Sequence, residues 1–297
     1  RLDVAADLGH SPEFNHYFWK EFRKAVRSAN PDAIVLAEHY GNPIDWLNGK
    51  EWDTVMNYDA FMEPVTWFLT GMQKHSDDYR GDLFGNADSF MGAMRHHMAS
   101  FTAPSLQIAM NELSNHDHSR FLTRTNKKVG VNKAVMREAV LIQMTWPGAP
   151  TIYYGDEAGV CGFTDPDNRR TYPWGHEDQE LIAFHREMIR IHKRYPVFRE
   201  GSVQMLEWRE NLLAYARTDQ NQRIVVIINN SDALEEVTVP VWQAEIPMRG
   251  RMRRLMYSYH EGYTTEYEEY IVEDGEIVVN MGAYSALVLK EMDVNYG

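Results

Sequence analysis

The strongest constraint on the fold is an alternation of short apolar strands and amphipathic helices. The segment RLDVA at 1–5 alternates charged and apolar residues with the period of a strand. Ser11 can cap a following helix, whose apolar residues recur at helical spacing as far as Val26. The segment AIVLA at 33–37 then has the character of a fully buried strand. Strand, helix and strand in this order predict the βαβ unit of a parallel sheet.

The same alternation continues along the first two thirds of the chain. Further strands are predicted at 54–58, 106–113 and 151–154, and helices at 132–144 and 180–195. Strands separated by helices indicate either a doubly wound sheet or a (β/α)8 barrel.

The pattern changes at about Pro196. From there short alternating strands are expected within 203–219, 223–231, 235–241, 268–280 and 284–291, separated by turn residues such as Asp274-Gly275. This arrangement predicts an all-β domain, a sandwich. We therefore expect two domains, an α/β domain at 1–196 and a β-sandwich at 197–297.

Composition narrows the class of partner. The net charge of -13 argues against nucleic acid or an anionic membrane and fits a neutral substrate. A single cysteine, Cys161, excludes an intramolecular disulfide and a cysteine-rich metal site. The most apolar stretch, 139–154, is interrupted by proline and glycine and predicts no membrane span. The sequence assigns no compartment.

Acidic side chains gather where the predicted strands end. Arg1 and Asp3 lie on the first strand, Glu38 directly follows the second, and His116 and Asp117 follow the fourth. In a parallel barrel the active site forms at the carboxyl ends of the strands, so we expect these groups at one rim. Paired carboxylates at close range suit glycosidic cleavage, one as nucleophile and one as proton donor.

Other interpretations remain for each group taken singly. An acid after a strand is often a helix cap, and the segment 115–117 can form an ordinary turn. His116 and His118 have the spacing of two metal ligands on one face, but no third ligand follows at a convincing distance. No metal site is therefore assigned.

Five short motifs carry a resemblance to a known family. RLDVA, VLAEHYG and SNHD resemble three of the sequence regions that define the α-amylase family of glycoside hydrolases. GAPTIYYGDEAG resembles the eighth strand of that family, and DPDNRRTYPW resembles the loop after it. The order of the motifs is that of the family, and the branch that they most resemble contains neopullulanases, cyclomaltodextrinases, maltogenic amylases and amylopullulanases.

The resemblance implies a role for each matching position. Asp3 would be the nucleophile, Glu38 the acid and base, and Asp117 the group that binds sugar hydroxyls and distorts the ring. Arg1 would hold Asp3 ionised, because a neighbouring guanidinium lowers a carboxylate pKa. His116 would donate to hydroxyls of the reacting sugar.

A second pair, Asp165 and Arg169, matches the residues that bind the next sugar in the family. The alternative interpretation of this pair is a salt bridge within a loop.

Retaining chemistry needs two carboxyl groups about 5 Å apart. Barrel strands lie about 4.8 Å apart, so Asp3 and Glu38 on consecutive strands suit retention. Two departures from the family branch, at Ala6-Asp7 and Thr171-Tyr172, bear on linkage preference.

The family's first motif, which should follow its third strand, is absent, so RLDVA would be the fourth strand. The resemblance implies strands 4–8 of a (β/α)8 TIM barrel, followed by the sandwich, without the N-terminal half of the barrel. No cofactor is implied within the chain, and any structural calcium would belong to that half. We expect the chain alone to be inactive and to form an oligomer or to associate with its own N-terminal portion.

Three hypotheses for function follow. The first is a retaining glycosidase that acts on starch-like glucans, pullulan or cyclodextrins and that can also catalyse transglycosylation. The second is a non-catalytic glycan- or partner-binding relative, which the presence of all three acids argues against. The third is a metal-dependent barrel hydrolase using His116 and His118, which a chelator would inhibit.

Overall fold

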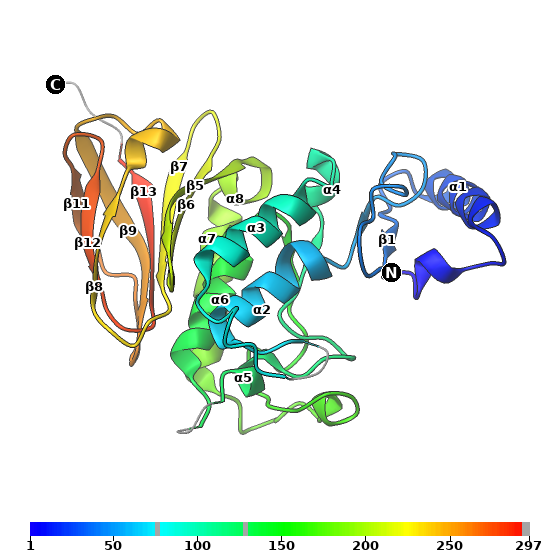
Figure 1. The fold of residues 1–297 in the computed structure, drawn as a ribbon, viewed down its shortest axis with the longest axis horizontal. Coiled ribbons are helices and arrows are strands. Elements are labelled where there is room, and N and C mark those ends of the chain that lie inside the picture. The colour runs from blue at the N-terminus through cyan, green and yellow to red at the C-terminus, as the bar shows by residue number, and fades with distance from the viewer. Residues whose placement is uncertain (75–77, 127–129, 293–297) are drawn as a thin grey trace.

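The computed structural model describes residues 1–74, 78–126 and 130–292. Figure 1 shows three parts in a row: an N-terminal segment with α1 and β1, a layer of helices, and a sandwich of strands. The helical layer lies against one face of the sandwich, and the N-terminal segment lies on the far side of that layer. Among the residues described, no helix is both long and apolar enough to cross a membrane.

Five short parallel segments run in chain order through the first two parts. Strand β1 (Leu36–Ala37) pairs in parallel with β2 (Thr54–Val55), and β3 (Met110–Asn111) with β4 (Ala149–Pro150). Single parallel bridges join Leu2 to β1 and connect Met56 with Met110. Each segment therefore lies beside the next one in the sequence, as the βαβ pattern predicted.

Helices α1, α6 and α7 lie where amphipathic spacing predicted them. Helix α1 (Pro12–Ala29) begins at Ser11, whose hydroxyl accepts a hydrogen bond from the Phe14 N–H at 3.2 Å. Side chains of Asn132 and Asp178 cap α6 (Lys133–Thr145) and α7 (Gln179–Arg194) in the same way. The other helical elements are η1 (Ala5–Asp7), η2 (Tyr58–Met62), α2 (Glu63–Thr70), α3 (Ala87–Met98), α4 (Ala103–Gln107), α5 (Phe121–Arg124), η3 (Asp167–Arg169), α8 (Val197–Glu200) and η4 (Val241–Ala244).

The expected strand at 1–5 is wrong beyond Leu2. The Leu2 N–H donates to the Leu36 carbonyl at 2.9 Å, and the Glu38 N–H donates to the Leu2 carbonyl at 2.8 Å. Val4 then has φ 41° and ψ 46°, a left-handed conformation that β-branched residues rarely adopt. The chain thus leaves the sheet immediately after Asp3.

The expected strand at 106–113 is also wrong in its first half. The Thr102 hydroxyl caps α4 by accepting from the Ser105 N–H at 3.4 Å, and a proline stands in the first turn. Only Met110–Asn111 then pair as a strand. A strand was also expected at 151–154, but the residues that pair lie just before it, at Ala149–Pro150.

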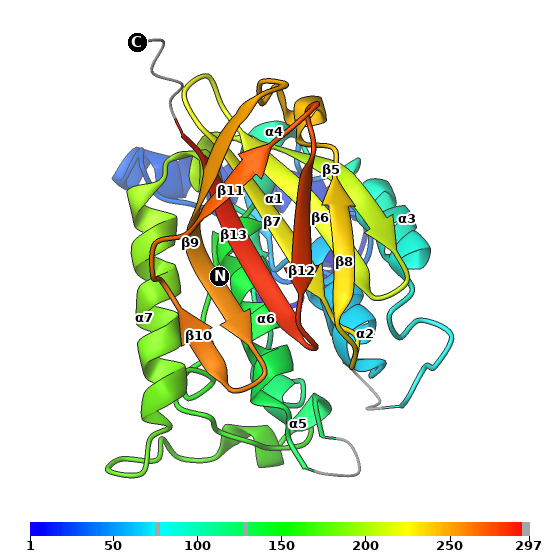
Figure 2. The same ribbon diagram turned by 90° about the vertical axis from the view of Figure 1, so that its left-hand side faces the viewer.

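The C-terminal part is the predicted all-β domain. Figure 2 shows its main sheet, in the order β10-β9-β13-β7-β6-β5, with β8 and β12 packed over it. Strands β9 and β10 were not predicted. The strands are β5 (Ser202–Arg209), β6 (Leu212–Thr218), β7 (Arg223–Asn229), β8 (Glu235–Val239), β9 (Gly250–Tyr259), β10 (Gly262–Thr264), β11 (Glu269–Val272), β12 (Ile277–Met281) and β13 (Ser285–Glu291).

The largest apolar core joins the helical layer to the sandwich. It runs without interruption from helix residues such as Phe90 and Leu141 to Tyr215 and Val226 on the main sheet. A second core fills the space between the two sheets. The N-terminal segment has a smaller core of its own around Trp19 and Trp52 and the residues between β1 and β2.

Candidate active site

One guanidinium holds the first two candidate acids together. Arg1 pairs with the Asp3 carboxylate through Nη1, and its Nη2 lies 3.0 Å from Glu38 Oε1. The Arg1 hydrogen bond holds the pKa of the Asp3 carboxyl below its usual range. The Glu38 side chain is 7% exposed, whereas that of Asp3 is 73% exposed. A buried and an open carboxylate therefore share one cation.

The left-handed turn at Val4 contributes to the same arrangement. The Val4 N–H donates to Glu38 Oε2 at 2.9 Å. Both Glu38 oxygens are thus occupied, one by Arg1 and one by the residue that follows Asp3. The abrupt exit of the chain from the sheet fixes Glu38 relative to Asp3.

A second group forms around Asp117. His116 Nε2 and Arg169 Nη2 lie 3.4 Å and 3.7 Å from Asp117 Oδ1. Arg169 Nε also pairs with Asp165 at 2.6 Å. His116 acts electrostatically on Asp3 as well, contributing to the lowering of its pKa. The structure therefore brings all seven candidate residues of the sequence into two neighbouring groups.

Buried amides hold the loop that carries His116 and Asp117. Asn115 Oδ1 accepts from the N–H groups of Asp117 at 3.0 Å and His118 at 3.2 Å. The Asn168 amide donates to the carbonyls of Asn115 at 2.9 Å and His118 at 2.8 Å. Sequence reasoning missed both amides; the Asn-x-Asp spacing of an Asx turn was the one signal for Asn115.

The two histidines of the predicted alternative have different surroundings. His118 is buried, with its ring 5.5 Å from the Tyr58 ring, while His116 lies against Asp117. Within residues 1–74, 78–126 and 130–292, no group of three or more histidine, cysteine, aspartate or glutamate residues is placed to hold a metal ion.

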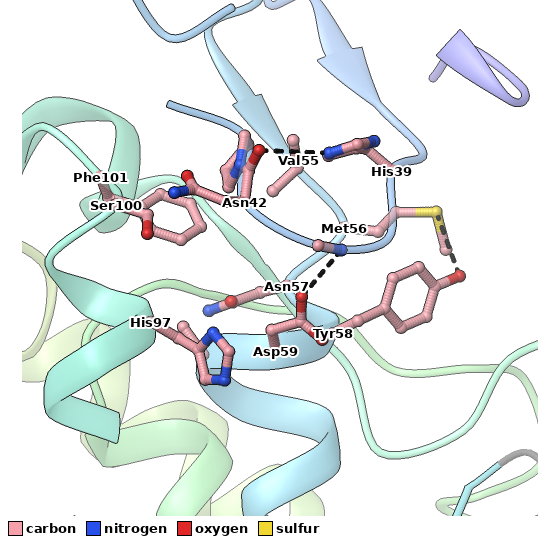
Figure 3. Close-up of a pocket in the computed structure, with 13 residues that line it drawn as sticks. His39, Asn42, Val55, Met56, Asn57, Tyr58, Asp59, His97, Ser100 and Phe101 are labelled. Carbon is pink, nitrogen blue, oxygen red and sulfur yellow. Dashed lines mark hydrogen bonds between the residues drawn. The ribbon is translucent and has the colours of Figure 1, made fainter. Parts of the chain in front are cut away.

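A small recess follows Glu38 in the chain. It lies between the loops after β1 and β2 and the end of α3, and both polar and apolar side chains line it (Figure 3). Asp59 Oδ2 accepts from the Gly41 N–H at 2.8 Å, and the His39 ring contacts the Asn42 carbonyl at 3.3 Å. Burial lowers the pKa of both His39 and His97. Neutral imidazoles and amides therefore line a recess next to the candidate acid.

Arg120 ties the Asp117 loop to the loops after β4. It is fully buried, donates to the Asn168 carbonyl at 2.8 Å and to the Tyr154 carbonyl, and lies 3.0 Å from Asp156 Oδ1. Its guanidinium also lies 4.0 Å from the centre of the Tyr153 ring. Burial raises the pKa of Asp156, which depends on this cation for its charge.

Replacing Arg120 by methionine is expected to lower the free energy of unfolding by about 3–5 kcal/mol, because Asp156 would lose the cation that compensates its buried charge. Denaturant unfolding of the whole protein measures this loss. The control is Arg170→Met, which breaks an exposed pair with Asp167 and is expected to cost at most about 1 kcal/mol. Equal losses for the two variants would contradict the importance of the buried pair.

Comparison with known proteins places this chain in a family. An α/β part with acids at the ends of its strands precedes an all-β part. The model "Alpha amylase, catalytic domain" matches residues 5–234, and "Alpha amylase, C-terminal all-beta domain" matches residues 205–291. The chain belongs to the α-amylase family, which confirms the resemblance carried by the five motifs.

Individual relatives fit the same branch. Neopullulanase 2 of Thermoactinomyces vulgaris is 37% identical over 245 residues, which are 81% of this chain and 38% of the relative. Amylopullulanase of Thermoanaerobacter thermohydrosulfuricus is 30% identical over 314 residues, covering 97% of this chain and 20% of the relative. The crystal structure of the debranching enzyme of Nostoc punctiforme matches with a TM-score of 0.79 at 27% identity, over 97% of this chain and 57% of that one. The chain thus spans well under half the length of these two curated relatives.

Proposed function

We propose that the whole protein is a retaining glycoside hydrolase that cleaves α-glucosidic bonds in starch-like glucans, pullulan or cyclodextrins, with transglycosylation to sugar acceptors as an alternative second step. The observation that carries the proposal is the Arg1 guanidinium between Asp3 and Glu38. The names of the relatives, which include neopullulanase, cyclomaltodextrinase and amylopullulanase, support the substrate class.

The reaction would proceed by double displacement. Asp3, kept ionised by Arg1, attacks the anomeric carbon while Glu38 gives its proton to the leaving glycosidic oxygen. The product is a covalent ester between the sugar and Asp3. Glu38, now a carboxylate, takes a proton from water or from an acceptor hydroxyl, and the resulting oxygen nucleophile displaces Asp3.

The second group would hold the sugar. Asp117 would bind ring hydroxyls and favour the distorted, oxocarbenium-like geometry, and His116 would donate to hydroxyls of the same unit. Asp165 and Arg169 would contact the adjacent sugar toward the non-reducing end. The contact of Arg169 with Asp117, at 3.7 Å, supports placing this pair beside the reacting sugar.

We further propose that the five parallel segments correspond to strands 4–8 of a (β/α)8 barrel, that the domains divide between residues 196 and 197, and that any structural calcium binds outside this chain. The chain by itself would be inactive, because Asp3 is 73% exposed and covalent sugar chemistry needs a site that excludes bulk water. Association with its own N-terminal portion or with a second copy of the chain would cover the exposed surface around Asp3.

The test is the configuration of the first product. Double displacement inverts the anomeric carbon twice, so the whole protein is expected to release the α-anomer from maltooligosaccharides before mutarotation. Proton NMR during the first minutes of hydrolysis distinguishes the anomers. Initial release of the β-anomer would overturn the retaining mechanism, and a lack of any turnover on starch, pullulan and cyclodextrins would overturn the function.

A further inference from the structure

Glu112 is a buried carboxyl group close to the site, and the double-displacement mechanism does not use it. It directly follows β3, is 2% exposed and lies beneath the turn that carries His116 and Asp117. Burying a carboxyl group is unfavourable unless it makes compensating hydrogen bonds. The Glu112 carboxyl therefore needs a partner group that donates a hydrogen bond to it.

That partner is the side-chain amide of Asn115. Asn115 Nδ2 donates to Glu112 Oε1 at 2.8 Å and to the Tyr58 hydroxyl at 3.0 Å. These two acceptors use both amide hydrogens, so the amide oxygen must point the other way. In that direction it accepts the N–H groups of Asp117 and His118. The hydrogen-bonding capacity of Asn115 is thus satisfied on both sides.

We propose that Glu112 is a positioning residue for Asp117: by accepting from Asn115, it fixes the orientation of the amide that shapes the 115–118 turn. This inference deepens the proposed function and rests on it. Without an oxygen at position 112, one buried amide hydrogen loses its acceptor, which weakens the preference of the Asn115 side chain for its present orientation. The loop then holds Asp117 less rigidly.

The charge of the site agrees with this role. Burial raises the pKa of Glu112 to about 7, opposed by the Asn115 hydrogen bond and the Arg1 charge and reinforced by Asp156 and Asp117. At mildly acidic pH Glu112 is then largely neutral. It can accept from Asn115 without placing another full negative charge next to Asp117.

Two variants of the whole protein separate the hydrogen bond from the volume of the side chain. Glu112→Leu removes the acceptor and is expected to lower kcat/KM on maltooligosaccharides by about 10- to 100-fold, mostly through kcat. Glu112→Gln keeps a carbonyl oxygen that can accept from Asn115 and is expected to retain activity within about 5-fold of the wild type. The unfolding midpoint of Glu112→Leu is expected to fall, because one buried amide hydrogen of Asn115 loses its acceptor, so kcat/KM is measured well below that midpoint.

The matched control is Glu138→Leu. Glu138 lies in α6 and is fully buried, and neither of its carboxyl oxygens has a hydrogen-bond partner among the residues that the structure describes. Removing this acid is expected to leave kcat/KM unchanged. If Glu138→Leu and Glu112→Leu lower kcat/KM equally, the effect belongs to buried acids in general and the proposal is wrong.

A double-mutant cycle tests whether Glu112 acts through Asp117. In an Asp117→Asn background, Glu112→Leu is expected to lower kcat/KM by less than about 2-fold. The carboxylate that Glu112 helps to position is already absent in that background. A full 10- to 100-fold loss in that background would show an independent effect and overturn the proposal.

Hydrogen exchange provides a readout that does not depend on turnover. The N–H groups of Asp117 and His118 are expected to exchange faster in Glu112→Leu than in the wild type or in Glu112→Gln, as measured by mass spectrometry on peptides covering 113–120. Unchanged protection would refute the positioning role even if the wild type hydrolysed glucans. An inactive wild type with the expected exchange pattern would instead refute only the proposed function.

Discussion

Replacing Asp3 by asparagine in the whole protein is expected to reduce turnover of unactivated glucan by about 10⁴-fold or more, because the amide cannot form the covalent sugar ester. Mass spectrometry after reaction with a mechanism-based fluorosugar checks the assignment. The wild type should carry the label on the peptide that contains Asp3, and the variant should carry none.

The control for this variant is Asp32→Asn, the same chemical change at an exposed loop position after α1. Its turnover should match that of the wild type. A label found on any other carboxylate, or near-normal turnover by Asp3→Asn, would show that Asp3 is not the nucleophile.

Replacing Glu38 by glutamine is expected to lower kcat on starch by about 10²- to 10⁴-fold, because the amide cannot transfer a proton to the leaving oxygen. The variant should still bind oligosaccharide. With an α-maltosyl fluoride, whose leaving group needs little protonation, glycosylation should be much less affected than with starch. Comparing single-turnover rates on the two substrates measures this difference.

Glu51→Gln is the matched control, since Glu51 is also a buried glutamate but pairs with His16 at 2.8 Å, away from the candidate acids. It is expected to leave kcat on starch within about 3-fold of the wild type. An equal loss on starch and on the fluoride in Glu38→Gln would contradict the role of Glu38 as general acid.

Helices were predicted more accurately than strands, because their signals are local. Helix α6 was expected at 132–144 and lies at Lys133–Thr145, since capping and apolar spacing both occur within the segment. The apolar run 106–113 was ambiguous: Thr102 begins a helix there, and only tertiary packing decides where pairing resumes. Strand β9 was missed because its arginines, such as Arg254 paired with Glu268, interrupt the alternation.

The candidate acids could be proposed from the sequence because each belongs to a short motif at or after a predicted strand. The contacts that hold these acids in place could not be predicted from the sequence. The Asn168 amide reaches a carbonyl 53 residues earlier in the chain, and the Asn115 amide reaches the Tyr58 hydroxyl 57 residues away. Nothing in the local sequence of Glu112 or Asn168 indicates such partners, because the contacts arise only when distant loops pack together.

The apolar core shared by the helical layer and the sandwich has a consequence for how the protein opens. Cooperative unfolding units follow buried contacts, and this core crosses the proposed domain boundary. Arg217 adds to the junction by donating to the Thr145 carbonyl at 2.6 Å, and Arg137 by donating to the Tyr259 carbonyl at 2.7 Å. The helical layer and the sandwich are therefore expected to melt as one unit. The N-terminal segment has a separate small core and is expected to open before them, and it carries Asp3 and Glu38 but not Asp117.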